Sequence, residues 1–173
     1  SEYVMILGSD HYISSDYFLA IDNLSFKDNH ILFPSTYVIM NEDNLSRKKI
    51  LHSRQNFLLR YTIPAPGFGW IAKSIKLKEF VRRRKGFLFN NQYKYATDNE
   101  VLFELIKSGW EYKFMKNHNA IYFFVHGGRS NQNLIEGSKE ACEIACKNAS
   151  GFNLDIKIIY FIRRQILKIK NYL

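Results

Sequence analysis

The sequence predicts an α/β fold, because short apolar segments alternate along the chain with longer amphipathic ones. Two of the apolar segments, residues 3–7 and 120–126, run directly into the polar loops "GSDH" and "HGGRSNQN". In open α/β sheets, ligands bind outside the carboxyl ends of the strands. The chain has 173 residues, of which 46% are hydrophobic, so one domain with a substantial core is expected. No run of 18 apolar residues occurs, so we expect neither a membrane-spanning helix nor a signal peptide.

The first third of the chain reads as strand, helix and hairpin. Residues 3–7 (YVMIL) form a continuous apolar run, typical of a strand buried on both faces. A helix over about 16–25, capped by Ser14 or Ser15, is expected next, with Phe18, Ile21 and Leu24 near one stripe. "HILFPSTYVIM" reads as extended with a bend or an edge at its proline, and "NEDN" as the turn of a hairpin whose second strand is "LSRKKILHS". A short helix is expected near 53–60.

The remainder of the chain is dominated by helix signals. "IPAPGFGWI" (63–71) is too rich in proline and glycine for regular structure, and the basic run "VRRRKG" follows at 81–86. A helix over 97–108 is the clearest element, since Thr97 and Glu100 form a capping-box pattern and Gly109 suits the position after a helix end. Strands at "EYKFM" and "AIYFFVH" and helices over about 134–149 and 154–172 complete the expected fold.

The charge and the cysteines limit the partners. The formal net charge of +9 suits an anionic partner, namely nucleic acid, anionic lipid or a nucleotide-type substrate, and charge alone does not choose among them. Nucleic acid is the weakest of the three, because there is no zinc-finger spacing and no RNA-recognition aromatic motif. Cys142 and Cys146 are four residues apart in a helical pattern, a spacing that disfavours a disulfide, so both are expected to be reduced core residues.

Three positions could carry chemistry, and each has a plainer alternative. Asp10 ends the first strand and His11 follows it, which suits a metal site or simply a turn. Asp98 lies in the first turn of the 97–108 helix, where the helix dipole favours an ionised carboxylate, so it could be a general base or only a helix cap. His126 ends the last strand and could join a metal site.

The loop that follows His126 is the last of these signals. Gly127 and Gly128 would let the backbone approach a ligand closely, and Arg129 could meet a diphosphate; the alternative is a plain turn.

Taken in order, these motifs resemble the second half of bacterial family 2 glycosyltransferases, which have the GT-A type nucleotide-diphospho-sugar transferase fold. The strand ending in G-S-D is similar to the strand that carries the family's acidic, DxD-like metal motif. "YKYATDNEVLFELIKSGWEYKFM" is similar to the stretch with the catalytic base, and "FFVHGGRSN" to the following G-G-x-S segment. The resemblance covers roughly residues 1–145. It implies that the family's N-terminal, nucleotide-binding half would precede Ser1 and is missing from this chain.

The resemblance assigns roles to individual residues. Asp10 matches the metal-binding aspartate, Asp98 the general base, and Gly127, Gly128 and Ser130 the G-G-x-S segment. The chain departs from the family at two positions: Gly8 stands where an acidic or amide residue is often found, and His11 replaces the usual second aspartate. Metal binding would then be weakened, or His11 would substitute as a ligand.

The activity implied by the resemblance is an inverting, metal-dependent sugar transfer in bacterial surface polysaccharide synthesis. A nucleotide sugar is the donor, a saccharide or a lipid-linked sugar is the acceptor, and Mg²⁺ or Mn²⁺ neutralises the departing diphosphate. Phe68 or Trp70 could stack on the acceptor sugar, or could be a core aromatic under the proline-rich loop. The alternatives are an inactive fragment or a binding module with the same fold, and less favourably a basic nucleic-acid-binding domain.

Residues 1–150 are thus expected to be the C-terminal portion of a glycosyltransferase catalytic domain, and 151–173 a basic amphipathic helix. In that helix Ile158, Ile162, Ile166 and Ile169 share a face, with Lys157, Arg164 and Lys168 opposite. Such a helix can rest on an anionic membrane or dock on its own domain. The location expected is the cytoplasm, with a peripheral contact at the inner face of the membrane as the option that this helix adds.

Overall fold

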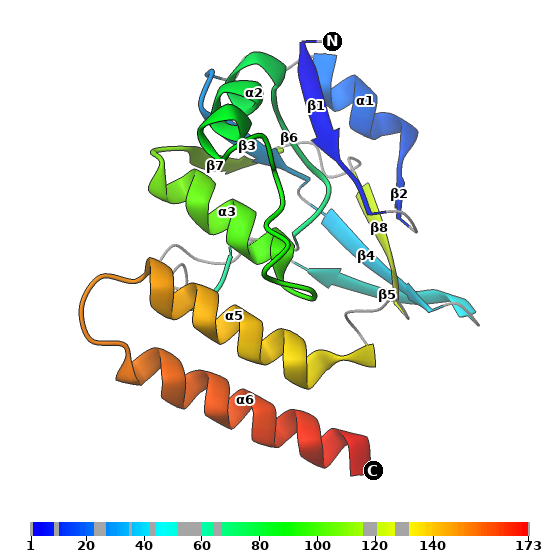
Figure 1. The fold of residues 1–173 in the computed structure, drawn as a ribbon. Coiled ribbons are helices and arrows are strands. Elements are labelled where there is room, and N and C mark those ends of the chain that lie inside the picture. Colours follow the sequence, from blue (N-terminus) through cyan, green and yellow to red (C-terminus); the bar gives the residue numbers. More distant parts are fainter. Residues whose placement is uncertain are drawn as a thin grey trace.

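The computed structural model describes residues 2–8, 11–22, 27–34, 36–41, 44–51, 60–63, 67–115, 121–126 and 132–172. These residues form an α/β fold with two four-stranded sheets and a layer of helices (Figure 1). The N-terminus lies beside the first sheet, and the C-terminus lies at the opposite end of the molecule. The expected α/β class is confirmed.

The first sheet has the strand order β1-β6-β3-β7. Its strands are β1 (Tyr3–Ile6), β6 (Trp70–Lys73), β3 (His30–Phe33) and β7 (Glu111–Phe114). Strand β6 is antiparallel to both of its neighbours, whereas β3 and β7 are parallel. Strands β1, β3 and β7 therefore point the same way, and β6 alone is reversed.

The second sheet has the order β2-β8-β4-β5. Its strands are β2 (Tyr12–Ile13), β8 (Ile121–His126), β4 (Thr36–Asn41) and β5 (Asn44–Leu51). The expected hairpin is confirmed, since β4 and β5 pair antiparallel across Asn41 and Asn44. The bend at Pro34 is confirmed too, and it moves the chain from β3 in one sheet to β4 in the other.

The helices are α1 (Ser15–Asp22), α2 (Ser74–Arg83), α3 (Thr97–Lys107), α5 (Leu134–Asn148) and α6 (Leu154–Tyr172). Helix α3 packs on α5, and α5 packs on α6, which returns antiparallel to it (Figure 1). The helices expected over 97–108, 134–149 and 154–172 are confirmed within one or two residues. Cys142 and Cys146 are free thiols, packed against the core from α5 as expected.

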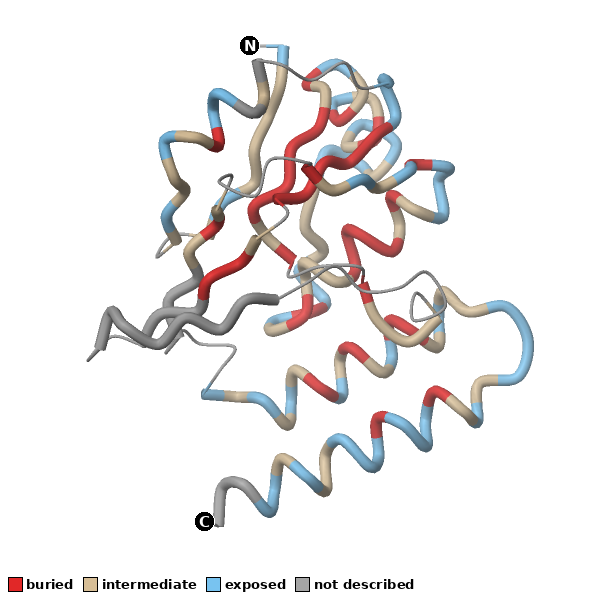
Figure 2. Tube along the Cα trace, turned by 180° about the vertical axis from the view of Figure 1, so that it is seen from behind, coloured by how far each residue is buried: buried red, intermediate tan, exposed pale blue. Residues whose placement is uncertain are grey.

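The core lies between the sheets and the inner faces of α3 and α5 (Figure 2). Its completely buried side chains include Ile31 and Phe33 from β3, Leu102 and Leu105 from α3, and Ile144 from α5. One buried ion pair borders this core, in which Arg84 donates to both oxygens of Glu100 at 2.7 Å. The pairing satisfies the buried Glu100 carboxylate, which is 3% exposed.

Four sequence expectations need correction or fall outside the described residues. Strand β1 is an edge strand and half-buried throughout, not buried on both faces. In α1 the buried residue is Tyr17, while Phe18 is exposed. Residues 70–83, for which neither a strand nor a helix was expected, form β6 and α2. The helix expected near 53–60 lies almost wholly outside the described residues.

The capping box expected at α3 is absent. Ala96 is the N-cap and no side chain caps the helix. The Glu100 carboxylate is occupied by Arg84 instead. The backbone just before the helix is bound by Glu140 of α5 instead. Its carboxylate accepts hydrogen bonds from the N–H groups of Lys94, Tyr95 and Ala96 at 2.7–3.1 Å. The C-terminal signal is confirmed, because Gly109 follows the C-cap residue with φ +86°.

Candidate functional site

Residues 67–69, immediately before β6, form a turn on which several elements converge; we call it the Gly67–Gly69 turn. The hydroxyl of Tyr17 on α1 donates to the Gly69 carbonyl, and that of Tyr37 on β4 donates to the Phe68 carbonyl at 3.5 Å. The Gly69 N–H donates to the carbonyl of Ile6 in β1 at 2.7 Å. The turn thus connects β1 and β6 of the first sheet with β4 of the second.

The tyrosines around this turn are hydrogen-bond donors and not acids. Burial raises the pKa of Tyr17 and of Tyr37 well above the ordinary value for a phenol, so both keep their protons at neutral pH. Tyr122 on β8 is also completely buried, and its ring packs edge-on against Tyr37 with 5.5 Å between centroids. Sequence reasoning missed these tyrosines, because they come from three distant elements and follow no spacing pattern.

Asp98 lies in the first turn of α3, as expected, and its carboxylate rests against the Gly67–Gly69 turn. A Cβ built on Gly67 would overlap Oδ2, Cβ and Cγ of Asp98, so only glycine leaves room for the carboxylate there. The carboxylate accepts hydrogen bonds from the N–H groups of Asn99 and of Asp98 itself.

Burial raises the pKa of the Asp98 carboxyl to about 6, and these two hydrogen bonds oppose the shift without cancelling it. Desolvation is therefore a larger effect on this carboxyl than the interactions that favour its charged form. A carboxyl with a pKa near 6 is mostly ionised at neutral pH and yet basic enough to accept a proton.

His11 contacts the same turn through Phe68. Its Nδ1 shares a hydrogen bond with the hydroxyl of Tyr122, and its ring meets those of Phe68 and Tyr122 edge-on at 5.7 and 5.3 Å between centroids. A Cβ on Gly8 would overlap the imidazole. The two departures from the family pattern are therefore linked: the His11 ring occupies the space that a side chain at position 8 would need.

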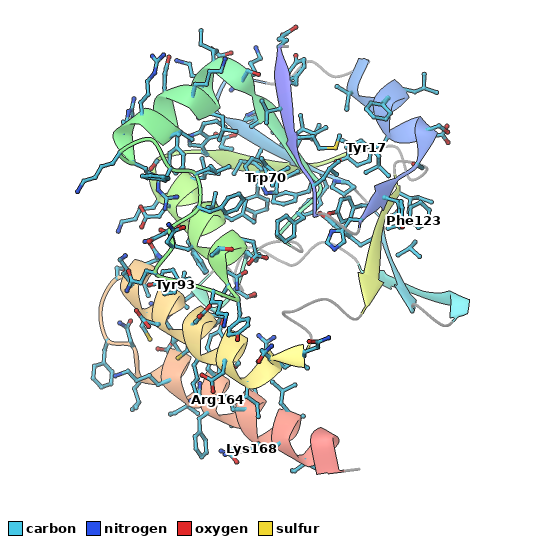
Figure 3. The ribbon with its side chains drawn as sticks, turned by 45° about the vertical axis from the view of Figure 1, so that its right-hand side comes forward. Tyr17, Trp70, Tyr93, Phe123, Arg164 and Lys168 are labelled. Atoms are coloured by element: carbon cyan, nitrogen blue, oxygen red, sulfur yellow. The ribbon has the colours of Figure 1, made fainter. Side chains whose placement is uncertain are left out.

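The turn therefore brings together three of the predicted site residues, Asp98, His11 and Phe68. Phe68 is half-buried, whereas Trp70 is 1% exposed and its indole N–H donates to the Gly67 carbonyl at 3.0 Å. Of the two alternatives for Trp70, the structure supports the core aromatic, because a buried indole presents no face to a ligand. Figure 3 shows Trp70 and Tyr17 in this interior region.

The other predicted site residues are only partly placed or not placed. Asp10 lies outside the described residues, as do Gly127, Gly128, Arg129 and Ser130. The backbone of His126 is opposite Asn41, at the end of the parallel pair of β8 and β4. It is four residues along β8 from Tyr122, which is about 13 Å between the two Cα atoms at the usual rise of a strand.

A divalent cation is not accounted for by the described residues alone. Among them, no group of three or more His, Cys, Asp and Glu side chains could hold a metal ion. His11 offers one imidazole, whose Nε2 could bind a metal only if Nδ1 carries the proton and donates it to Tyr122. One nitrogen does not satisfy Mg²⁺ or Mn²⁺, which prefer oxygen ligands.

A separate recess of about 540 Å³ lies among α2, α3, α5 and the loop after α2. Cationic side chains line much of it: Arg83, Arg84, Lys85 and Lys147. Glu100 and Glu104 offset part of that charge, and Arg84 is already paired with Glu100. None of the predicted site residues lines this recess.

Comparisons with protein-family models, with curated protein sequences and with solved structures find no significant match to this chain. The class of protein is defined by the fold alone, as α/β with two mixed sheets. Within the described residues, no helix is both long and apolar enough to cross a membrane.

Proposed function

We propose that this chain is the acceptor-side part of a glycosyltransferase of the GT-A type, with Asp98 as the general base. One observation carries the proposal: the Asp98 carboxyl, with a pKa of about 6, lies against Gly67 of a glycine turn whose next residue, the half-buried Phe68, packs against the imidazole of His11. A carboxylate in that state suits deprotonation of a sugar hydroxyl. The family 2 motifs of the sequence supply the reaction class.

In the proposed reaction, Asp98 accepts the proton of an acceptor hydroxyl while that oxygen attacks the anomeric carbon of the donor sugar. The new C–O bond forms on the face opposite the leaving nucleoside diphosphate, which departs with the electron pair of the broken bond, so the anomeric configuration inverts. Phe68 offers an aromatic surface for the acceptor ring. The substrate classes are a nucleotide-sugar donor and a saccharide or lipid-linked acceptor.

The metal enters the proposal through Asp10, which would supply a carboxylate oxygen beside His11. The described residues do not complete a metal site. Removing divalent cations with EDTA should abolish transfer, and Mn²⁺ or Mg²⁺ should restore it. Unchanged turnover in EDTA would remove the metal, but not Asp98, from the proposal.

The decisive experiment compares Asp98→Asn with the unmodified protein. The full protein that contains this chain is incubated with UDP-, GDP- and dTDP-sugars and a panel of mono- and disaccharides, and release of nucleoside diphosphate is measured. We expect turnover to fall about 10²-fold or more in Asp98→Asn, with donor affinity little changed. Asp28→Asn, an exposed aspartate paired with Lys73, is the matched control and should be fully active.

Two other outcomes would decide against the proposal. Donor binding without turnover in the unmodified protein would favour the alternative of a binding module with the same fold. Equal turnover by Asp98→Asn and the unmodified protein would mean that Asp98 is only a residue of the helix start.

A further inference from the structure

In the part of the chain that the structure describes, helix α6 is anchored to the domain through one buried face and through its first turn. Ile156 and Tyr160 are buried against the rest of the molecule, and the Tyr160 hydroxyl donates to the carbonyl of Tyr61 at 2.6 Å. At the start of the helix Arg60 donates to both oxygens of Asp155 at 2.7 and 3.1 Å, and also to the carbonyls of Ser150 and Phe152. These contacts determine which side of α6 faces outward.

The outward side of α6 is apolar. The side chains that share this exposure are, with their exposed fractions, Leu154 51%, Ile158 48%, Ile159 44%, Phe161 56%, Ile162 52%, Ile166 49% and Ile169 59%. Phe152, just before the helix, is 80% exposed. Figure 2 shows that exposed residues recur along α6 as far as its exposure is described, up to residue 169. Apolar side chains gathered in this way on one face indicate an interaction surface.

Cationic side chains border this apolar stripe. At 100° per residue, Lys157, Arg164 and Lys168 fall on one edge of the stripe and Arg163 on the other edge. The expectation that the first three lie opposite the isoleucines is corrected, because the opposite side carries the buried Ile156 and Tyr160. Figure 3 shows Arg164 and Lys168 on this outer helix. The one acidic residue of α6, Asp155, is already paired with Arg60. The uncompensated charge of the exposed surface of α6 is therefore positive.

We propose that α6 docks this protein on an anionic membrane surface, lying in the plane of the headgroups with its isoleucine stripe inserted. The stripe would enter the boundary of the acyl chains, and the flanking cations would lie at the level of the lipid phosphates. The charge argues against a second copy as the occupant, because two such helices would bring like charges together. This inference is independent of the proposed transfer reaction.

The test is co-sedimentation with vesicles of phosphatidylcholine alone and with vesicles that also contain about 30% phosphatidylglycerol, whose negative charge should attract the lysines and arginines of α6. Binding is expected to the anionic vesicles, and it should weaken as salt rises from about 0.05 to 0.5 M. Lys157→Gln with Lys168→Gln should weaken binding roughly 30-fold, since two cations are lost from the interface. Lys78→Gln with Lys107→Gln, two exposed lysines on α2 and α3, is the matched control and should bind normally.

A second pair of variants tests the apolar stripe. Ile162→Glu should abolish binding, whereas Ile75→Glu, at an exposed isoleucine of α2, should not. The unmodified protein alone can also overturn the proposal. It would do so if its binding did not change with salt, or if it bound equally to both types of vesicle. A dimer in light scattering that Ile162→Glu dissociates, together with no vesicle binding, would show that a second copy covers the stripe.

Discussion

At the scale of single residues, the proposed general base Asp98 lowers the stability of the folded protein at neutral pH. Its carboxyl has a pKa of about 6 in the folded protein, above the ordinary value near 4 of the unfolded chain. The folded protein therefore binds more protons than the unfolded chain between about pH 4 and 6, and the free energy of unfolding falls as the pH rises through that window. The loss is complete about one pH unit above 6, where the carboxylate is charged in both states.

Asp98→Asn should therefore stabilise the protein at pH 7.5 by about 2 kcal/mol, as expected for a neutral isostere that still accepts the two backbone hydrogen bonds. The measurement is urea denaturation at pH 4.0 and 7.5. We expect the stabilisation to shrink towards zero at pH 4.0. A variant that is destabilised at pH 7.5 would show that the ionised carboxylate is held by favourable interactions, contrary to a raised pKa.

Gly67→Ala should reduce turnover as strongly as Asp98→Asn while leaving the aspartate in place. The added methyl group would overlap Oδ2, Cγ and Cβ of Asp98, and because side-chain rotation does not move Cβ, the start of α3 must shift away from the turn. Gly137→Ala is the control, because its methyl group would meet only Tyr95, at an ordinary 3.4 Å, on a helix that favours alanine. Steady-state kinetics of the two variants is the measurement, and equal activity of both would exclude the close contact at Gly67.

At the scale of elements, the segment that directly precedes α3 is hydrogen-bonded to a side chain of another helix. Glu140 on α5 receives three backbone N–H groups, those of Lys94, Tyr95 and Ala96. Glu140→Ala leaves these donors without their acceptor and should destabilise the protein by about 2 kcal/mol. Because the segment leads directly into Asp98, turnover should fall as well.

Glu136→Ala provides the comparison on the same helix, since Glu136 makes only an exposed i,i+3 pair with Lys139. Its effect on thermal unfolding should be within about 0.5 kcal/mol. If the two variants melt alike, the Glu140 contacts contribute nothing to the start of α3.

How far the sequence predicts these elements depends on where their signals lie. The limits of α3 could be predicted because Gly109 and the apolar spacing are local. Whether Glu100 would cap the helix could not, because Arg84, sixteen residues earlier, competes for its carboxylate. Strand β6 was missed because its four residues follow a turn rich in glycine and proline, and its pairing with β1 and β3 is entirely long-range.

The candidate site also combines features that local sequence predicts with features that depend on long-range packing. Local sequence predicts that Asp98 lies at the start of a helix. It also predicts that polar residues, His11 among them, follow the first strand. The convergence of Asp98, His11 and Phe68 on one turn depends on packing between the two sheets, and so does the burial that sets the pKa of Asp98. No spacing in the chain encodes that packing, which is why Tyr17, Tyr37 and Tyr122 had no sequence signal.

At the scale of the whole molecule, the Gly67–Gly69 turn joins the two sheets. Its residues contact β1, β4, β8 and α1 through Ile6, Tyr37, Tyr122 and Tyr17. Tyr37 and Tyr122 belong to the main core cluster, against which Ile6 packs, and Tyr17 belongs to a second cluster. Because the turn contacts both clusters, damage at this point should loosen both sheets together and should not unfold one of them alone.

Gly69→Ala tests this connection, with Gly86→Ala as its matched control. Both glycines have positive φ, +82° and +89°, so each alanine variant incurs the same backbone strain of about 1–2 kcal/mol. Only at Gly69 would the new Cβ also meet a side chain, the Tyr122 ring at 2.5 Å, whereas nothing lies within 4 Å at Gly86. The difference between the two variants therefore isolates the packing of the turn against β8.

We expect Gly69→Ala to be at least about 2 kcal/mol less stable than Gly86→Ala, in line with overpacking of a core. Tryptophan fluorescence reports Trp70 in β6 and Trp110, directly before β7, so both probes belong to the first sheet. Unfolding followed by this fluorescence and by far-ultraviolet circular dichroism should give one coincident transition. Equal stability of the two variants would mean that Tyr122 moves aside without cost, and two separate transitions would mean that the sheets unfold independently of the turn.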